Sequence, residues 1–169
     1  MEKEEGKIPI EGVIGDVLRE GGLSLSTAES CTGGLLSHRI TNVSGSSDYY
    51  KGGIVAYSNE VKQKILHVAE KTLKEKGAVS AACAREMSSG VRNLLDADIG
   101  IATTGIAGPT GGTPDKPVGL VYIALATKEY VYHEKHIFQG DRGENKREAV
   151  DAALEMLKAS LKRARSSER

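Results

Sequence analysis

One segment of the chain places a hydroxyl and a thiol side by side where a strand is expected to end and a helix to begin. It reads Thr-Ala-Glu-Ser-Cys-Thr-Gly-Gly at 27–34. A side chain at such a turn lies near unpaired backbone N–H groups and the positive end of a helix dipole. Those donors can hold an anion, or can stabilise the oxyanion that forms when a nucleophile attacks a carbonyl. Ser30 is therefore a candidate nucleophile, although the pattern alone is more typical of Ser30 or Thr32 as a helix N-cap.

Cys31 competes with Ser30 for the same role, because a thiol at a helix N-terminus is acidified and nucleophilic. A cysteine nucleophile is usually activated by a histidine. None of the four histidines falls in a segment that is expected to border this turn. A Cys–His pair therefore has no support in the sequence.

A lysine that could serve as a base lies in Ala-Tyr-Ser-Asn-Glu-Val-Lys at 56–62. Ser58 or Asn59 is expected to cap a helix whose first turn or so contains Lys62. The helix dipole disfavours a cation there, and partial burial would lower the pKa further, so that the amine could accept a proton. The alternative is a solvated helix face. Tyr57 ends an apolar segment that predicts a buried strand at 54–57, and it either packs there or contacts the site.

A long loop, Gly105 to Pro117, is rich in glycine, proline and hydroxyl side chains and follows a predicted buried strand at 99–102. It should lie at the carboxyl edge of the sheet, where α/β folds bind ligands. Such a loop can present N–H groups to phosphate, although it is neither a P-loop nor Gly-x-Gly-x-x-Gly, and it could also be a simple bend. Arg142 could add a bidentate phosphate contact or could be a surface arginine.

Composition narrows the functional classes. Lys plus Arg equals Asp plus Glu at 23 each, so no long-range field favours nucleic acid or an anionic membrane. The charged start has no apolar segment behind it, and no apolar run has transmembrane length, which predicts a cytoplasmic protein. Two cysteines and four scattered histidines give no disulfide framework and no metal-ligand spacing, so we expect no metal and no cofactor.

The predicted elements must bring these segments together. Helices are expected at 8–20, 34–42, 58–66, 80–95 and from about 144, and strands at 23–30, 54–57, 99–102, 118–127 and 130–138. The last two strands are so close in sequence that they predict an antiparallel hairpin. The alternation predicts an α/β protein, a single layered domain with a mixed β-sheet flanked by helices over residues 1–169. Residues 1–7 and 163–169 are expected to be flexible.

Taken together, these segments resemble the C-terminal domain of the CinA family, the nicotinamide-nucleotide amidases. The resemblance spans about residues 10–160 and rests on an ordered series of motifs, which is far more specific than any one of them. Besides 27–34, the series contains Gly-Ser-Ser at 45–47, Tyr-Ser-Asn-Glu-x-Lys at 57–62, Gly-Ala-Val-Ser at 77–80, Gly-Ile-Ala-Gly-Pro-x-Gly-Gly at 105–112, Lys-Pro-Val-Gly at 116–119 and Gly-Asp-Arg at 140–142.

The resemblance implies a Ser/Lys amidohydrolase that converts nicotinamide mononucleotide to nicotinate mononucleotide and ammonia. Its nucleophile falls on Ser30 and its base on Lys62, and Tyr57 is expected to hydrogen-bond one of them or to contact the pyridinium ring. The expected substrate-binding residues are Cys31, Thr32, Gly33 and Gly34 around the oxyanion, Asn59, and Thr104, Gly105 and Arg142 around the phosphate.

The resemblance also implies a domain organisation and an oligomeric state, and it leaves other functional classes open. Many relatives carry a second domain in front of this one, for which 169 residues leave no room, so a stand-alone enzyme is expected. A homodimer is expected as well. Two other functional classes stay open: a non-catalytic nucleotide-binding or adaptor domain that uses the same glycine-rich loop, and a purely structural partner domain.

Overall fold

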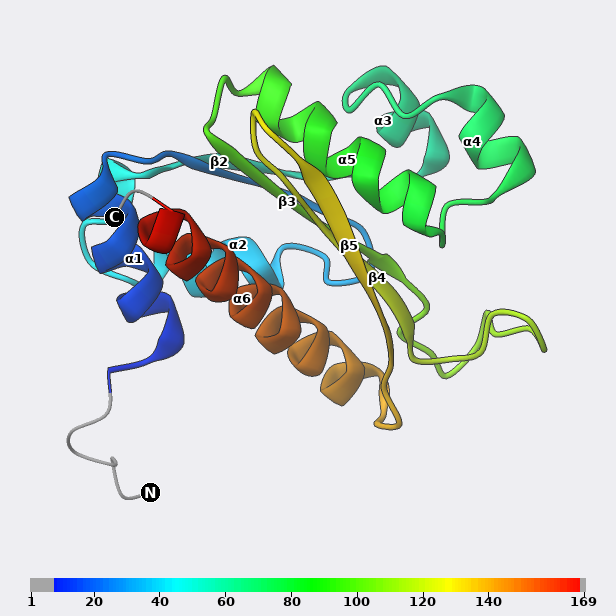
Figure 1. Ribbon diagram of the computed structural model, residues 1–169. Coiled ribbons are helices and arrows are strands. Elements are labelled where there is room, and N and C mark those ends of the chain that lie inside the picture. Colours follow the sequence, from blue (N-terminus) through cyan, green and yellow to red (C-terminus); the bar gives the residue numbers. More distant parts are fainter. Residues whose placement is uncertain (1–7, 168–169) are drawn as a thin grey trace.

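The computed structural model describes residues 8–167, in which five strands form one mixed sheet with the order β2-β1-β3-β4-β5 (Figure 1). The strands are β1 (Leu25–Glu29), β2 (Tyr50–Val55), β3 (Ile99–Gly105), β4 (Leu120–Ala126) and β5 (Val131–Ile137). β1 pairs in parallel with both β2 and β3, while β4 and β5 continue the sheet as an antiparallel hairpin. The carboxyl ends of β1, β2 and β3 therefore meet at one edge.

Helices cover both faces of the sheet and complete the three layers (Figure 1). They are α1 (Ile10–Gly21), α2 (Leu35–Thr41), α3 (Asn59–Lys64), α4 (Glu70–Glu75), α5 (Ala81–Leu94) and α6 (Arg142–Ser167), with a 3₁₀ turn η1 at Ser46–Asp48. α1, α2 and α6 enclose one buried apolar cluster, and α5 with the segment around α3 encloses the other. The expected mixed sheet flanked by helices is confirmed.

Two glycines let α5 approach the sheet and its neighbours closely. A Cβ at Gly90 would lie 2.0 Å from the Leu66 carbonyl oxygen, and one at Gly100 would lie 2.2 Å from the Ser88 carbonyl oxygen. No larger residue fits at such distances without moving backbone, so both positions require glycine. The close approach at Gly90 places Leu66, which follows α3, against α5.

The structure corrects four details of the predicted elements. The segment at 54–57 was expected to be a buried strand, but β2 begins at Tyr50 and is an edge strand whose residues alternate between half-buried and exposed. Tyr57 lies beyond the end of β2 and is 62% exposed, so it is not a buried strand-end tyrosine. The charged segment before Gly77 contains a helix, α4, and α6 begins at Arg142 rather than near Glu144.

Residues 163–167, which were expected to be flexible, continue α6, while residues 1–7 and 168–169 lie outside the described part of the chain. Among the described residues, every helix is too short or too polar to cross a membrane.

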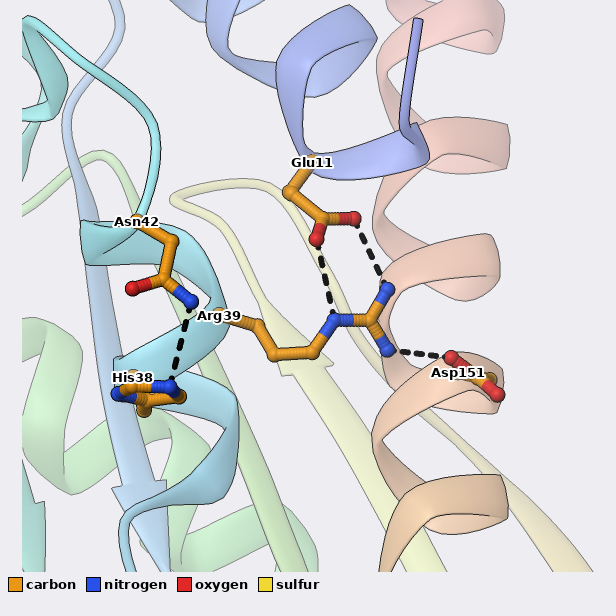
Figure 2. Close-up of polar contacts among 5 residues, drawn as sticks. All are labelled: Glu11, His38, Arg39, Asn42 and Asp151. Carbon is orange, nitrogen blue, oxygen red and sulfur yellow. Dashed lines mark hydrogen bonds and ion pairs between the residues drawn. The ribbon is translucent and has the colours of Figure 1, made fainter. Parts of the chain in front are cut away.

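One arginine ties three helices together on the face that α6 covers (Figure 2). Arg39 of α2 donates two hydrogen bonds to the Glu11 carboxylate of α1, at 3.1 and 2.9 Å, and a third to Asp151 of α6. The bidentate geometry fixes the guanidinium plane. The contact therefore holds α2 against α1 and α6.

Candidate active site

A pocket of about 300 Å³ opens at the edge where β1, β2 and β3 end. Eight of the eleven predicted site residues line it: Ser30, Cys31, Tyr57, Asn59, Lys62, Thr104, Gly105 and Arg142. Thr32, Gly33 and Gly34 do not. The described lining residues include two basic side chains, Lys62 and Arg142, and no carboxylate. The pocket is therefore suited to a substrate that carries negative charge.

The central contact of this pocket joins Ser30 and Lys62. Ser30 follows the last residue of β1, and its N–H donates to the Thr103 carbonyl of β3 at 3.0 Å. Lys62 comes from α3, whose N-cap is Ser58, as expected. The Lys62 amine lies 3.0 Å from the Ser30 hydroxyl oxygen, and both residues are buried, Lys62 being only 1% exposed. A solvated helix face is therefore excluded for Lys62.

Two backbone carbonyls fix the direction of the Lys62 amine. It donates to the carbonyls of Ala56 at 2.8 Å and Tyr57 at 3.2 Å. Burial is the main cause that lowers the pKa of Lys62, and it is one of the two causes expected from the sequence. A neutral amine has two N–H groups and one lone pair. The two carbonyls take the N–H groups, and the lone pair then faces the Ser30 hydroxyl.

The two cysteines near Lys62 are poor nucleophiles. Cys31 lines the pocket but is 7% exposed, and burial raises the pKa of its thiol to about 12. Cys83 of α5 is fully buried, and burial raises the pKa of its thiol to about 11. Both thiols therefore stay protonated near neutral pH, which argues against the Cys31 alternative.

The turn after Ser30 is held by a residue that the sequence analysis did not single out. The Glu29 carboxylate is 1% exposed and accepts from the backbone N–H groups of Leu36 (2.8 Å) and Ser37 (3.0 Å). It thereby caps α2, whose N-cap position is Gly34 and has no side chain to do so. The N-cap role that was considered for Ser30 or Thr32 is thus filled by Glu29. An acidic residue before a serine turn is the only signal the sequence offered.

The opposite wall of the pocket is fastened by side chains from β3 and from the glycine-rich loop. The Thr104 hydroxyl donates to the Ala78 carbonyl at 2.8 Å, and the Lys116 amine donates to the Lys76 carbonyl at 2.7 Å. Ala78 and Val79 line the pocket, and they belong to the Gly-Ala-Val-Ser motif whose role the sequence left open. Because its hydroxyl proton is donated to the Ala78 carbonyl, Thr104 forms part of the pocket wall.

Arg142, the first residue of α6, spans the pocket mouth. Its guanidinium donates to the Gly108 carbonyl at 2.7 Å and to the Tyr57 hydroxyl at 3.1 Å. The Tyr57 side chain therefore contacts Arg142 and neither Ser30 nor Lys62, contrary to one of the roles expected for it. Only the Tyr57 backbone carbonyl reaches Lys62. The Arg142 guanidinium and the Tyr57 ring thus face the pocket from two segments that are far apart in the sequence.

A second hollow, of about 570 Å³, also borders Arg142. It shares Ala107 and Arg142 with the first and is otherwise lined by Pro109, Val118, Gly140, Asp141 and Gly143. Although it is larger, it lacks a paired nucleophile and base. We therefore assign the candidate active site to the smaller pocket, which contains Ser30 and Lys62.

Comparison with known proteins agrees with this architecture. The chain is 36% identical to the competence-damaged protein (CinA) superfamily protein of Klebsiella pneumoniae, with a TM-score of 0.88 over 91% of this chain and 96% of that one. It is 39% identical to the competence/damage inducible protein CihA of Agrobacterium tumefaciens, with a TM-score of 0.85 over 91% of this chain and 98% of that one.

A longer relative is the CinA-like protein of Salinibacter ruber, which is 49% identical over 156 residues. This alignment covers 92% of the present chain but 38% of the relative, so the chain spans less than half the length of that protein. The family model described as the CinA C-terminal domain matches residues 7–161. This match agrees with the order of strands and with the motif series, and it shows that the chain belongs to the CinA C-terminal domain family.

Proposed function

We propose that this chain is an amidohydrolase that converts the carboxamide of nicotinamide mononucleotide to the carboxylate and ammonia. The observation that carries the proposal is the 3.0 Å contact between the Lys62 amine and the Ser30 hydroxyl in a buried pocket. A serine beside a lysine whose pKa is lowered by burial is the arrangement that an activated nucleophile needs.

In the first step, neutral Lys62 takes the proton of Ser30 while Ser30 Oγ attacks the carboxamide carbon. The resulting oxyanion needs N–H donors. The N–H groups of Leu36 and Ser37 are bonded to Glu29, and that of Gly33 is bonded to the Ser30 carbonyl at 3.1 Å. Of the residues in the 31–34 turn, only Cys31 lines the pocket, so we assign the oxyanion to the Cys31 N–H.

In the second step, the ammonium of Lys62 gives its proton to the leaving nitrogen, and the C–N bond breaks to release ammonia. An ester between Ser30 and the nicotinoyl group remains. Lys62, neutral again, takes a proton from a water molecule that attacks this ester, and returns it to Ser30 Oγ as the acid leaves. Each turnover thus consumes one amide and one water and restores both side chains.

The charges of the substrate match the pocket at both ends. The pyridinium ring is a cation, and a cation close to Lys62 favours the neutral amine. The Tyr57 ring at the pocket mouth can lie against the pyridinium face. The 5′-phosphate fits the guanidinium of Arg142 and the N–H groups of the loop that begins at Gly105, since both favour anions.

The experiment that tests the proposal is ammonia release from nicotinamide mononucleotide by the purified chain. Nicotinate mononucleotide is the expected second product, and Ser30→Ala should abolish both. Wild-type protein that binds the mononucleotide without releasing ammonia would favour a non-catalytic nucleotide-binding domain. Protein that shows no binding at all would favour a structural role.

A further inference from the structure

The carboxylate of Glu29 stands at the centre of a buried network directly before the proposed nucleophile. It accepts four hydrogen bonds from three residues. Oε1 accepts from the Leu36 N–H at 2.8 Å and the Thr32 hydroxyl at 2.7 Å. Oε2 accepts from the Ser37 N–H at 3.0 Å and the Ser37 hydroxyl at 2.7 Å. Every hydrogen-bond position of this carboxylate faces a donor, so the amide N–H groups of a glutamine side chain would have no acceptor there.

The hydroxyl groups around Glu29 all direct their protons toward it. Because the Thr32 hydroxyl donates to Glu29, the Thr103 hydroxyl must be the donor in its 2.7 Å contact with Thr32. Because the Ser37 hydroxyl also donates to Glu29, it accepts from the Tyr50 hydroxyl at 2.8 Å. The carboxylate thus sets the orientation of a whole set of neutral groups.

The network has two arms that differ in their distance from the reaction. One arm runs through Thr32 to Thr103, whose backbone carbonyl also accepts from the Ser30 N–H at 3.0 Å. This arm holds the Ser30 turn from both sides. The other arm runs through Ser37 to Tyr50 on β2, with the Thr27 hydroxyl of β1 in contact with both hydroxyls at 2.8 and 2.7 Å, and it holds α2 against the sheet. A substitution in the first arm should therefore displace Ser30, whereas a substitution in the second arm should leave Ser30 in place.

We propose that Glu29 is a positioning residue of the hydrolysis: through Thr32 and the N-terminal N–H groups of α2, it fixes the turn that carries Ser30 Oγ and the Cys31 N–H. The proposal rests on Ser30 being the nucleophile of the proposed function. It adds a residue that touches neither substrate nor Lys62 but determines the geometry in which they react.

The test compares Glu29→Gln with the matched control Tyr50→Phe, which removes a hydroxyl from the far arm and leaves Glu29 and all four of its donors in place. Both variants should be less stable than the wild type. Glu29→Gln should lower kcat by about 100-fold with KM within about twofold, since a displacement near 1 Å costs this much. Tyr50→Phe should keep kcat within about threefold of the wild type.

The pH profile separates positioning from a general loosening of the pocket. Lys62 does not contact Glu29, so the midpoint of the activity that remains in Glu29→Gln should match that of the wild type. Water that reached Lys62 through a loosened pocket would raise this midpoint, because burial is what lowers the pKa of Lys62. A raised midpoint, or equal losses of kcat in Glu29→Gln and Tyr50→Phe, would overturn the proposal.

If Glu29→Gln does not fold, Thr32→Val takes its place, because it removes one donor of the near arm and keeps the carboxylate that caps α2. It should lower kcat about 10-fold with an unchanged KM. A kcat equal to that of Tyr50→Phe would overturn the proposal.

A second readout keeps this proposal separate from the identity of the substrate. A fluorophosphonate labels an activated serine whatever amide the enzyme uses, and its labelling of Ser30 should slow in the same order as kcat falls. Wild-type protein that is labelled but inert toward nicotinamide mononucleotide would overturn the proposed substrate and leave Glu29 testable by labelling. Wild-type protein that is neither labelled nor active would overturn both proposals.

Discussion

The amine of Lys62 lies 3.0 Å from the hydroxyl of Ser30, although 32 positions separate them in the chain. Parallel pairing of β1 with β2 brings them together, because Ser30 follows one strand and Lys62 the other. The Ala56 N–H extends this pairing by donating to the Glu29 carbonyl at 2.8 Å. Two carbonyls then aim the amine, so little reorganisation is needed when it accepts a proton.

Replacing the two neighbouring candidate nucleophiles should separate them clearly. Ser30→Ala should reduce the rate of ammonia release by about three orders of magnitude or more, because Ser30 Oγ forms the covalent intermediate in the proposed mechanism. Cys31→Ala should retain most of the activity, since burial raises the pKa of its thiol to about 12. An inactive Cys31→Ala together with an active Ser30→Ala would assign the nucleophile to the thiol.

The pH dependence of the rate should follow the proton of Lys62. Its pKa is lowered from the ordinary value of 10.5, chiefly by burial, so activity should rise with pH and level off below that value. Lys62→Arg should be nearly as inactive as Lys62→Ala, because a guanidinium stays protonated. A flat profile from about pH 6 to about pH 10, or an active arginine variant, would remove Lys62 from the role of base.

The same lowered pKa should appear in the stability of the protein. Between the lowered pKa of folded Lys62 and the ordinary value of 10.5, the unfolded chain binds a proton that the folded chain does not. The contribution of Lys62 to the free energy of unfolding therefore increases as pH rises through this window. Denaturant unfolding of the wild type and of Lys62→Met should show a difference in stability that shifts in favour of the wild type with rising pH. A difference that is constant with pH would mean that Lys62 keeps its ordinary pKa in the folded protein.

The sequence predicted the location of the site because the motifs follow strands. Ser30 and the loop from Gly105 each come after a segment that reads as a buried strand, and parallel strands end at the same edge. Local pattern was sufficient for both. It was also sufficient for the Ser58 cap that begins the helix of Lys62.

The sequence could not predict contacts that depend on the tertiary packing of the segments. Nothing in the local pattern shows that Glu29 points toward α2, or that Tyr57 passes the edge of the sheet and meets the guanidinium of Arg142. The strand was predicted to begin at residue 54 rather than at Tyr50, because glycines such as Gly52 and Gly53 are not typical of strands. A Cβ at Gly53 would lie 2.3 Å from the Thr27 hydroxyl oxygen, so glycine is required there by the buried hydroxyls and not by a turn.

Removal of the arginine that joins α1, α2 and α6 should affect stability and not the chemistry. Arg39→Met should lower the free energy of unfolding at neutral pH by about 1–2 kcal/mol, since two partly exposed carboxylates lose their partner. Arg39 is also the main cause that lowers the pKa of Glu11, and such stabilisation is lost as pH falls through the folded pKa. The difference between wild type and variant should therefore shrink in acid, as measured by denaturant unfolding.

The control for this measurement is Lys64→Gln, which removes an ion pair to Glu60 that is exposed on both sides. It should change stability by less than about 0.5 kcal/mol. Equal effects of the two substitutions would show that Arg39 contributes no more than a surface ion pair.

Arg142 should act on the phosphate of the substrate rather than on the amide. Nicotinamide riboside has the same carboxamide and ribose but no 5′-phosphate, so wild-type kcat/KM should be much lower for it. Arg142→Ala should lower kcat/KM for the mononucleotide by an amount equivalent to about 1.5–3 kcal/mol, the range for a charge-assisted contact. The same substitution should change the riboside rate little, because that substrate offers no partner to the guanidinium.

Tyr57→Phe is the matched control, since it removes the hydroxyl that Arg142 contacts at 3.1 Å and leaves the guanidinium bonded to the Gly108 carbonyl. If the hydroxyl only restrains Arg142, this variant should lose less on the mononucleotide than Arg142→Ala does. The comparison of three proteins with two substrates gives the coupling between arginine and phosphate directly. Equal losses for both substrates in Arg142→Ala would show that Arg142 supports the pocket through Gly108, and that the phosphate is held by other groups.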